Sequence, residues 1–260
     1  MAIVHFKKSL ETLREIYSDN LSVPLIAEDL FACPLDGDAL EVKQNMEESD
    51  FDYYGVENNG KIIGYIVRSE LKDGLISKYV HPFEMDDLIS ESTSLIELLQ
   101  IFKDKNPVFV LEKNQVKKLL TLADLQKQPI RMLVFGLISL LEMNLLELIK
   151  KSYPDNGWTQ CLSEGRIEKA LEVYEKRKQK NEGLGLIECI QLSDKGTIIR
   201  KTPQLLNQLE FHSKKEVDRF FSSIEELRNN TAHSQEYVYD DFNDFLDSIN
   251  RIEKLLRVLP

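Results

Sequence analysis

Apolar and polar residues follow different patterns in the two halves of this chain. In the first half, the pattern predicts a helix followed by a strand hairpin. Apolar positions three to four residues apart predict a helix over residues 39–48. Apolar runs predict strands over residues 53–57 and 61–67. Between them, Asn-Asn-Gly at residues 58–60 signals a hairpin turn, because Asn and Gly tolerate positive φ. The second strand is continuously apolar, as in strands buried on both faces, and a short helix should follow over residues 68–71.

The same order of elements returns about 50 residues later. A helix is predicted over residues 94–102 and strands over residues 108–111 and 116–121. A turn at residues 112–115 separates the strands, and a short helix follows over residues 122–125. A repeated order of helix, strand, turn, strand and short helix predicts two similar α/β units in tandem.

The second half of the chain has helical periodicity instead. Its apolar residues recur every three to four positions in four segments, which predict helices over residues 131–151, 163–180, 214–228 and 240–256. Such helices with short connections are expected to pack as an all-α bundle. The expected fold class is α+β. The α/β domain should occupy residues 1–128, with units at about 18–75 and 76–128, and the helical domain should occupy residues 129–260.

Charge is distributed unevenly between these halves. The chain has 260 residues, 33 Lys+Arg against 44 Asp+Glu and a net charge of −11, which excludes a basic protein that coats nucleic acid. Residues 1–130 carry −9 of this charge and residues 131–260 carry −2. The second half also has basic clusters at residues 176–180, 200–201 and 214–215. This difference suggests two modules with different partners.

The sequence indicates no metal site and no membrane span. The cysteines at positions 33, 161 and 189 are widely spaced and form no ligand motif, so neither a disulfide framework nor a bound metal is expected. The longest apolar run, residues 132–141, is shorter than the roughly 20 residues that a membrane span needs. The N-terminal residues are charged too early for a signal peptide. We therefore expect a cytoplasmic protein.

The tandem repeat resembles a CBS-domain pair, the regulatory module named after cystathionine β-synthase. Its second unit ends in Thr-Leu-Ala-Asp at residues 121–124, similar to the family pattern of Thr or Ser followed three residues later by Asp. In family members that bind adenosine nucleotides, the Asp contacts the ribose and the Thr or Ser contacts phosphate. The resemblance implies that Thr121 and Asp124 bind a regulatory adenine nucleotide, such as AMP, ADP, ATP or an oligoadenylate. In the first unit Val67 and Glu70 occupy these positions, so only Glu70 keeps an acceptor for the ribose.

Simple chemistry is compatible with such a site but leaves an alternative. A carboxylate offers two acceptor oxygens to a vicinal diol, and a short helix after Thr121 offers free N–H groups to an anion. Alternatively, Thr121 and Asp124 only cap that helix. The net charge of −9 disfavours an anionic ligand and no Gly-rich phosphate loop is present. The repeat pair can therefore also be a dimerising scaffold.

The helical half contains Arg-Asn-Asn-Thr-Ala-His at residues 228–233, just before the last predicted helix. This segment resembles the signature of HEPN-domain proteins, in which an Arg is followed by a polar residue and, here five positions after the Arg, by a His. The resemblance implies a metal-independent endoribonuclease that leaves 2′,3′-cyclic phosphate ends, with Arg228, Asn229 and His233 as its catalytic residues. The alternative is an exposed turn between helices, in which Asn229 and Asn230 stop the helix.

The residue types suit RNA cleavage. His233 can move protons near neutral pH, Arg228 can brace a phosphate with its planar fork, and Asn229 can orient either of them. Five residues of continuous helix turn by about 500°, which leaves Arg228 and His233 about 140° apart. They converge only if the helix breaks at residues 229–231 or if two copies face each other. The resemblance places the site at a dimer interface, so we expect a homodimer with both residues of both chains in one cleft.

The combined interpretation is a nucleotide-regulated endoribonuclease that cleaves RNA, and a toxin or defence role would fit it. One alternative is a non-catalytic regulatory or dimerisation protein that binds a partner. Another is a nucleotidyl transferase, which would need an acidic metal-binding pair that the sequence does not show. Three further residues are expected to be structural: His81 in a loop between the repeats, His212 before an N-cap, and the buried Trp158.

Overall fold

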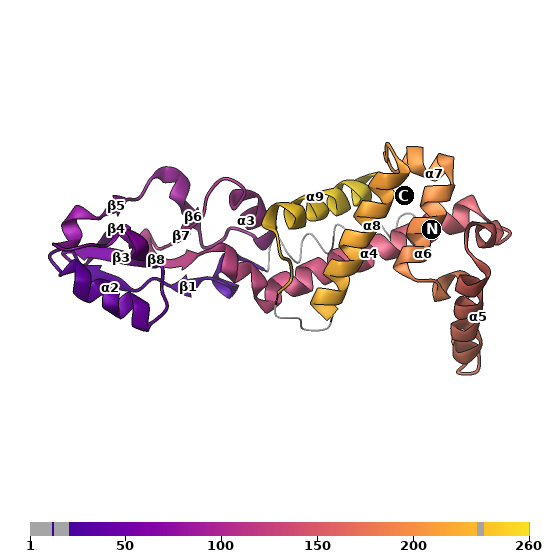
Figure 1. Cartoon of the computed structure of the whole chain (residues 1–260), viewed down its shortest axis with the longest axis horizontal. Helices are drawn as coiled ribbons and strands as arrows, with labels where there is room; N and C mark the ends of the chain where they lie inside the picture. The colour runs from indigo at the N-terminus through magenta and orange to yellow at the C-terminus, as the bar shows by residue number, and fades with distance from the viewer. Residues whose placement is uncertain (1–11, 13–20, 233–236, 260) are drawn as a thin grey trace. The chain divides into compact units, whose positions relative to one another are not determined.

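The computed structural model describes residues 12, 21–232 and 237–259. The described chain forms two compact units (Figure 1). The repeat unit lies within residues 16–129, and the helical unit consists of residues from 130 onward together with residue 12. Each is considered by itself. Their mixture of small sheets and helices confirms the α+β class.

The first half of the repeat unit is a four-stranded sheet covered by one long helix. Its elements are β2 (Ala32–Pro34), α2 (Ala39–Glu48), β3 (Tyr53–Asn58), β4 (Lys61–Val67), η3 (Arg68–Glu70) and β5 (His81–Pro82). The strand order is β2-β3-β4-β5, with β2 parallel to β3 and the other pairs antiparallel. The Asp38 carboxylate caps α2 by accepting from the backbone N–H groups of Leu40 and Glu41.

The second half repeats this arrangement. Its elements are β6 (Leu88–Ser90), α3 (Leu95–Ile101), β7 (Val108–Glu112), β8 (Gln115–Leu120) and η6 (Leu122–Gln126). The sheet order is β1-β8-β7-β6, in which β1 (Glu28–Asp29) comes from before the first repeat. In the same way β5, which comes just before the second repeat, completes the first sheet. Each sheet therefore includes an edge strand from outside its own repeat. The hydrogen bonds of these strands join neighbouring segments of the chain in addition to the covalent connection.

Local details also agree between the repeats. The β3–β4 hairpin turns through Asn59 and Gly60, and the β7–β8 hairpin turns through Lys113 and Asn114, with positive φ at all four residues. The register shifts by one residue at matching places, after Val56 in β3 and after Val110 in β7. The predicted repeat of helix, strand, turn, strand and short helix is confirmed.

Two details of the first repeat differ from expectation. The strand β4 is not buried on both faces, because Ile63 is 40% exposed while its neighbours Gly64 and Ile66 are buried. His81 is not in a loop but in the short edge strand β5, paired with Tyr65 of β4. A two-residue edge strand has too little sequence to show a period, which is why the pattern missed it.

The helical unit contains six α-helices in its described residues. They are α4 (Gln128–Ser152), α5 (Glu164–Lys178), α6 (Leu192–Lys201), α7 (Pro203–Gln208), α8 (Lys214–Ala232) and α9 (Phe242–Val258). The short 3-10 helices η7 (Gly157–Cys161) and η8 (Leu186–Cys189) connect them. The four predicted helices are confirmed, whereas α6 and α7 were not predicted.

The central helix of this unit is α4, which buries residues all along its length. It is long and apolar enough to cross a membrane by length and composition, and 56% of its most apolar window is buried inside the unit. The core helix of a soluble protein passes the same test. Trp158, in η7, is fully buried, as expected.

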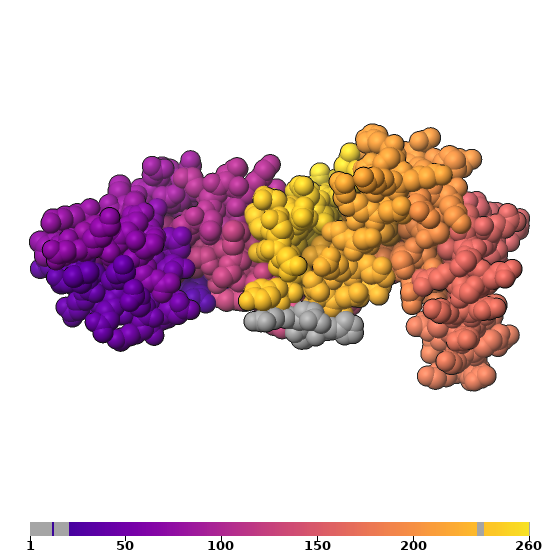
Figure 2. Space-filling model, in the orientation of Figure 1, coloured from indigo at the N-terminus to yellow at the C-terminus, as the bar shows by residue number. Residues whose placement is uncertain are grey.

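By contrast, α5 buries only Ala170 and carries a basic last turn at residues 176–178. Figure 2 shows this helix and its following loop standing away from the other helices of the unit.

Candidate functional site

The Arg-Asn-Asn-Thr-Ala part of the HEPN-like sequence lies within the last turns of α8. This helix buries Val217, Phe220, Phe221, Ile224 and Leu227, which leaves Arg228 at the edge of the apolar face. The helix continues to Ala232, so the expectation that Asn229 and Asn230 stop it is wrong. The break at residues 229–231 that would bring Arg228 and His233 together is also not formed.

Arg228 lies in an ion cluster with residues of two other helices. Its Nη1 is 3.4 Å from Oε2 of Glu142 on α4. The other carboxylate oxygen of Glu142 accepts from Nζ of Lys195 on α6, at 3.1 Å. Lys195 is buried, with 8% of its side chain exposed, while Arg228 and Glu142 keep 32% and 24%. One carboxylate thus contacts a buried cation on one side and a partly exposed cation on the other.

The end of α8 is held by two hydrogen bonds. The buried Arg131 of α4 donates from Nη1 to the carbonyl oxygen of Asn230, at 3.1 Å. The side-chain amide of Asn230 donates to the carbonyl oxygen of Val238, at 3.2 Å. Asn230 therefore ties α8 to the chain that leads into α9, whereas Asn229 is exposed. His233 lies outside the described residues.

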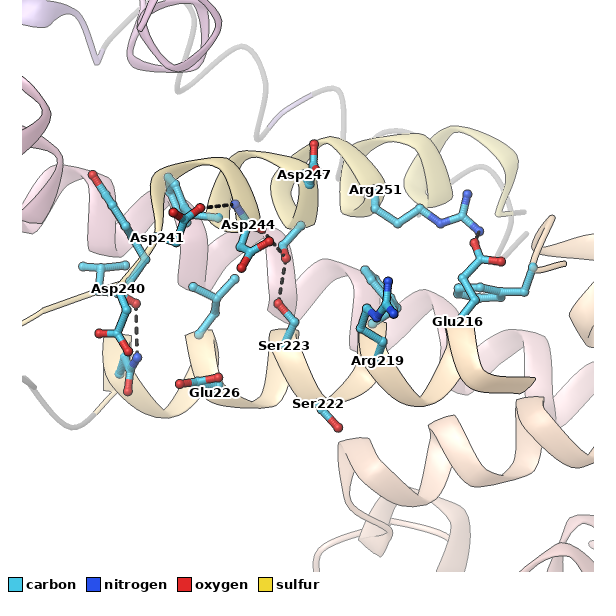
Figure 3. Close-up of a pocket in the computed structure, with 18 residues that line it drawn as sticks. Glu216, Arg219, Ser222, Ser223, Glu226, Asp240, Asp241, Asp244, Asp247 and Arg251 are labelled. Carbon is cyan, nitrogen blue, oxygen red and sulfur yellow. Dashed lines mark hydrogen bonds and ion pairs between the residues drawn. The ribbon is translucent and has the colours of Figure 1, made fainter. Parts of the chain in front are cut away.

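A cavity of about 700 Å³ lies between α8 and α9 (Figure 3). Its walls carry six carboxylates, at residues 216, 226, 240, 241, 244 and 247, against the two arginines at residues 219 and 251. Figure 3 shows Glu226 of α8 and Asp244 of α9 on facing walls. Such a lining repels phosphate. Arg228 is not among the lining residues.

In the repeat unit, Thr121 and Asp124 lie together at the start of η6. The carboxylate of Asp124 accepts from the backbone N–H of Thr121 at 2.7 Å and from its hydroxyl at 3.3 Å. The same carboxylate forms an ion pair with Lys127, at 2.6 Å, and is 7% exposed. These contacts are those of a helix cap, the alternative considered for this pair.

Lys127 joins this cap to the segment before the first repeat. It contacts Glu28 at 3.0 Å and donates to the carbonyl oxygen of Ile26 at 2.6 Å. Burial acts to lower the pKa of Lys127, but the hydrogen bonds and charges of Asp124 and Glu28 outweigh burial and raise it. Lys127 therefore remains charged at neutral pH.

Glu70 has a different partner, in the first repeat. Its Oε2 lies 2.6 Å from Nε2 of His81, and both side chains are about half exposed. The His81 ring stacks on Tyr65, with ring centroids 5.2 Å apart. Tyr65 in turn contacts Phe83 and Phe109. Glu70 thus presents a carboxylate beside an aromatic cluster. In the part of the chain that the structure describes, no group of three or more possible metal ligands is found.

Comparison with known proteins gives structural similarity only. No family model and no curated protein matches the sequence. Solved CBS-domain structures match the repeat unit's part of the chain: a hemolysin-like protein containing a CBS domain from Oenococcus oeni is 12% identical, covering 44% of this chain and 93% of its own, with a TM-score of 0.36. The CBS domain of a bacterial CNNM/CorC family Mg²⁺ transporter, solved with ATP, is 16% identical, covering 45% and 92%, with a TM-score of 0.36.

An uncharacterized conserved protein from Pyrococcus horikoshii is also similar, with 17% identity, coverage of 41% of this chain and 90% of its own, and a TM-score of 0.37. The chain is therefore similar to CBS-domain proteins over its N-terminal part.

Sequence reasoning did not find Glu142, Lys195 or Arg131, and it considered Asn230 only as a residue that stops the helix. The motif pattern looks at neighbours along the chain, but Glu142 is 86 residues from Arg228. A signal existed for Glu142 nonetheless, since it is a charged residue directly after the apolar run of residues 132–141.

Proposed function

We propose that this protein is a metal-independent endoribonuclease whose activity is regulated by an adenine nucleotide bound to the repeat unit. The observation that supports it best is the placement of Arg228. Its side chain lies at the edge of α8, a third exposed, and its described partner is a single carboxylate oxygen. The planar guanidinium has five N–H donors, so contact with Glu142 leaves others for a phosphate.

The proposed reaction moves, in net terms, one proton from the 2′-hydroxyl to the departing 5′-oxygen, and it replaces one P–O bond with another. The 2′-hydroxyl loses its proton and its oxygen bonds to the adjacent phosphorus, while the bond from phosphorus to the 5′-oxygen of the next nucleotide breaks. The products are a 2′,3′-cyclic phosphate and a free 5′-hydroxyl. His233 transfers the proton, Arg228 stabilises the charge that builds on the phosphate oxygens, and Asn229 orients them.

The proposal includes a homodimer. Because α8 stays helical through Ala232, the break at residues 229–231 that one of our two expected arrangements needs is not formed. A second copy facing the first is the remaining arrangement of the two that we considered. The mass of the particle in solution, measured by light scattering in the activity buffer, should be twice the 30.1 kDa of one chain.

Cleavage of mixed RNA in excess EDTA tests the activity. The wild type should produce cyclic phosphate ends, and Arg228→Ala and His233→Ala should each reduce the rate by about 100-fold or more. Arg228→Lys keeps a charge for Glu142 but not the planar fork, so it should also lose most activity. Asp218→Asn, which breaks the exposed pair between Arg200 and Asp218 on α6 and α8, serves as the control. Undiminished activity in both alanine variants would refute the proposal.

Calorimetry with AMP, ADP, ATP and short oligoadenylates tests the sensor. The proposed ligands of the nucleotide are Thr121, Asp124 and Glu70. Asp124→Asn keeps an acceptor for the cap while removing the charge, and it should weaken binding, as should Glu70→Gln. Asp38→Asn, at the cap of α2, is the matched control. If the wild type binds none of these ligands, the repeat unit is a scaffold.

A non-catalytic regulator remains the second candidate function. The contacts of Arg228 with Glu142 and of Asp124 with Thr121 favour it, because each residue already has a structural role. In that case the RNA assay should show no cleavage while the dimer persists.

A further inference from the structure

The ion cluster of Glu142, Lys195 and Arg228 joins three helices at one point. Each oxygen of the Glu142 carboxylate contacts a different cation, Lys195 at 3.1 Å and Arg228 at 3.4 Å. The three residues come from α4, α6 and α8, which are far apart in sequence. A carboxylate held on both oxygens has little freedom to rotate.

Close packing of α6 against α8 places Lys195 there. Gly196 lies so near Phe221 that a Cβ on Gly196 would be 2.6 Å from the ring Cγ. Its neighbour Lys195 is buried, and a buried ammonium is strongly destabilising without an anion. Glu142 is its described partner, so the burial of Lys195 fixes where the Glu142 carboxylate lies.

The contact with Arg228 is of a different kind. It is long, it involves one nitrogen, and about a third of the arginine side chain is exposed. Partly exposed pairs of this kind contribute little to stability. They do restrict a long side chain to fewer rotamers, which matters where a guanidinium must meet a phosphate in a defined orientation.

From this geometry we propose that Glu142 is a positioning residue for Arg228, and that Lys195 in turn holds Glu142. This inference rests on the proposed ribonuclease function. Lys195 and Glu142 do not touch the RNA. Glu142 orients the Arg228 fork before RNA binds, so that its remaining N–H groups point at the place where phosphate charge develops.

Three variants separate positioning from stability. Glu142→Gln removes the anion and leaves Lys195 buried without one, so it should be both destabilised and slow. Lys195→Met with Glu142 intact should fold and lose less activity. The double variant Glu142→Gln, Lys195→Met removes the buried charge and should recover stability without recovering activity. Asp218→Asn, in the exposed pair between the same α6 and α8, should change neither.

The kinetic result expected for Glu142→Gln and for the double variant is a fall in kcat of about 10- to 100-fold, with KM changed much less. Recovery of kcat in the double variant would show that Glu142 is only a counter-ion for Lys195, and would overturn the proposal. So would a gain in kcat or RNA affinity in Glu142→Gln, because Glu142 would then be a competitor of the phosphate.

A measurement without RNA keeps this test independent of the ribonuclease assay. The side-chain ¹⁵N–¹H signal of Arg228, assigned by its loss in Arg228→Lys, should show slow hydrogen exchange in the wild type and fast exchange in the double variant. Equal exchange in both would overturn the positioning role even if RNA is cleaved. A protected Arg228 in a protein that cleaves no RNA would instead leave the ordering by Glu142 intact and refute the ribonuclease.

Discussion

At the scale of the residue, Cys33 shows how burial changes reactivity. Its thiol is buried in the core of the first repeat and donates to the carbonyl oxygen of Gly55, at 3.6 Å. Burial raises the pKa of this thiol to about 11 from 9.0, and a backbone hydrogen bond offsets this only in part. Since the thiolate is the nucleophile, Cys33 in the folded protein should be unreactive at neutral pH.

Alkylation by iodoacetamide, followed by mass spectrometry of the Cys33 peptide, measures this effect. At pH 8 the folded protein should react about 100-fold more slowly at Cys33 than the protein in urea, where the thiol regains its ordinary pKa. The folded state binds this proton more tightly than the unfolded state. The stability linked to it is therefore complete below pH 9 and is lost as the pH rises toward 11. Equal rates at pH 8 in buffer and in urea would contradict the assignment.

At the candidate sites, the residue types could be predicted from the sequence, but the partners that these residues contact could not. The pattern of Thr121 and Asp124 along the chain predicts a capping pair as readily as a ribose ligand, because both need a carboxylate three residues after a hydroxyl. The structure shows the capping contacts. For Arg228 the sequence predicts a cation at the end of a helix, but its partner Glu142 is set by tertiary packing that spacing does not encode.

At the scale of the element, the approach of α6 to α8 depends on Gly196. Ala is favoured over Gly inside a helix by about 1 kcal/mol. At Gly196, however, the added methyl group would overlap the Phe221 ring. Overpacking of a core costs about 1–3 kcal/mol, so Gly196→Ala should lower the free energy of unfolding of the helical unit.

The measurement is urea unfolding followed by the fluorescence of Trp158. This is the only tryptophan in the sequence and it is buried in the helical unit, so its emission reports that unit alone. Gly165→Ala is the matched control, because a Cβ at this exposed helical position meets nothing within 4 Å. That control should be neutral or stabilising. A Gly196→Ala protein as stable as the wild type would show that Phe221 moves aside without cost.

Elements with a clear period were predictable, and those without one were not. The bounds of α2 and β4 agree with the sequence pattern to the residue, because their apolar spacing and the Asn-Gly turn are local signals. The helices α6 and α7 are short. Only Thr202 separates them, because α7 begins at Pro203. In addition, α6 buries the polar residues Asp194 and Lys195, which blurs its hydrophobic pattern.

At the scale of the whole molecule, the two halves of the chain differ in net charge. Residues 1–130 carry most of the net charge of −11, while residues 131–260 are nearly neutral. A protein of this charge does not attract RNA over its whole surface. The proposed ribonuclease must therefore bind RNA locally, at the Arg228 edge of α8, and the proposed regulation must act on that edge.

A route for regulation follows the chain. The helix α4 begins at Gln128, two residues after η6 ends at Gln126, and it carries Arg131 and Glu142. The N-cap of η6 is Thr121, whose backbone N–H donates to the carboxylate of Asp124. A nucleotide that changes the position of η6 would therefore act on the helix that holds both Arg228 and the end of α8. A ligand shifts such an equilibrium only if it binds the two positions with different affinity.

Thermodynamic reciprocity makes this coupling measurable. An RNA with 2′-O-methyl groups cannot react but can bind, so its affinity can be measured with and without saturating nucleotide. If nucleotide changes RNA affinity by some factor, RNA must change nucleotide affinity by the same factor, of about 5- to 150-fold in coupled systems. Glu142→Gln should reduce the factor toward one, while Asp218→Asn should leave it unchanged. If both ligands bind and neither changes the affinity for the other, the two units act independently. The repeat unit then does not regulate the proposed ribonuclease through α4.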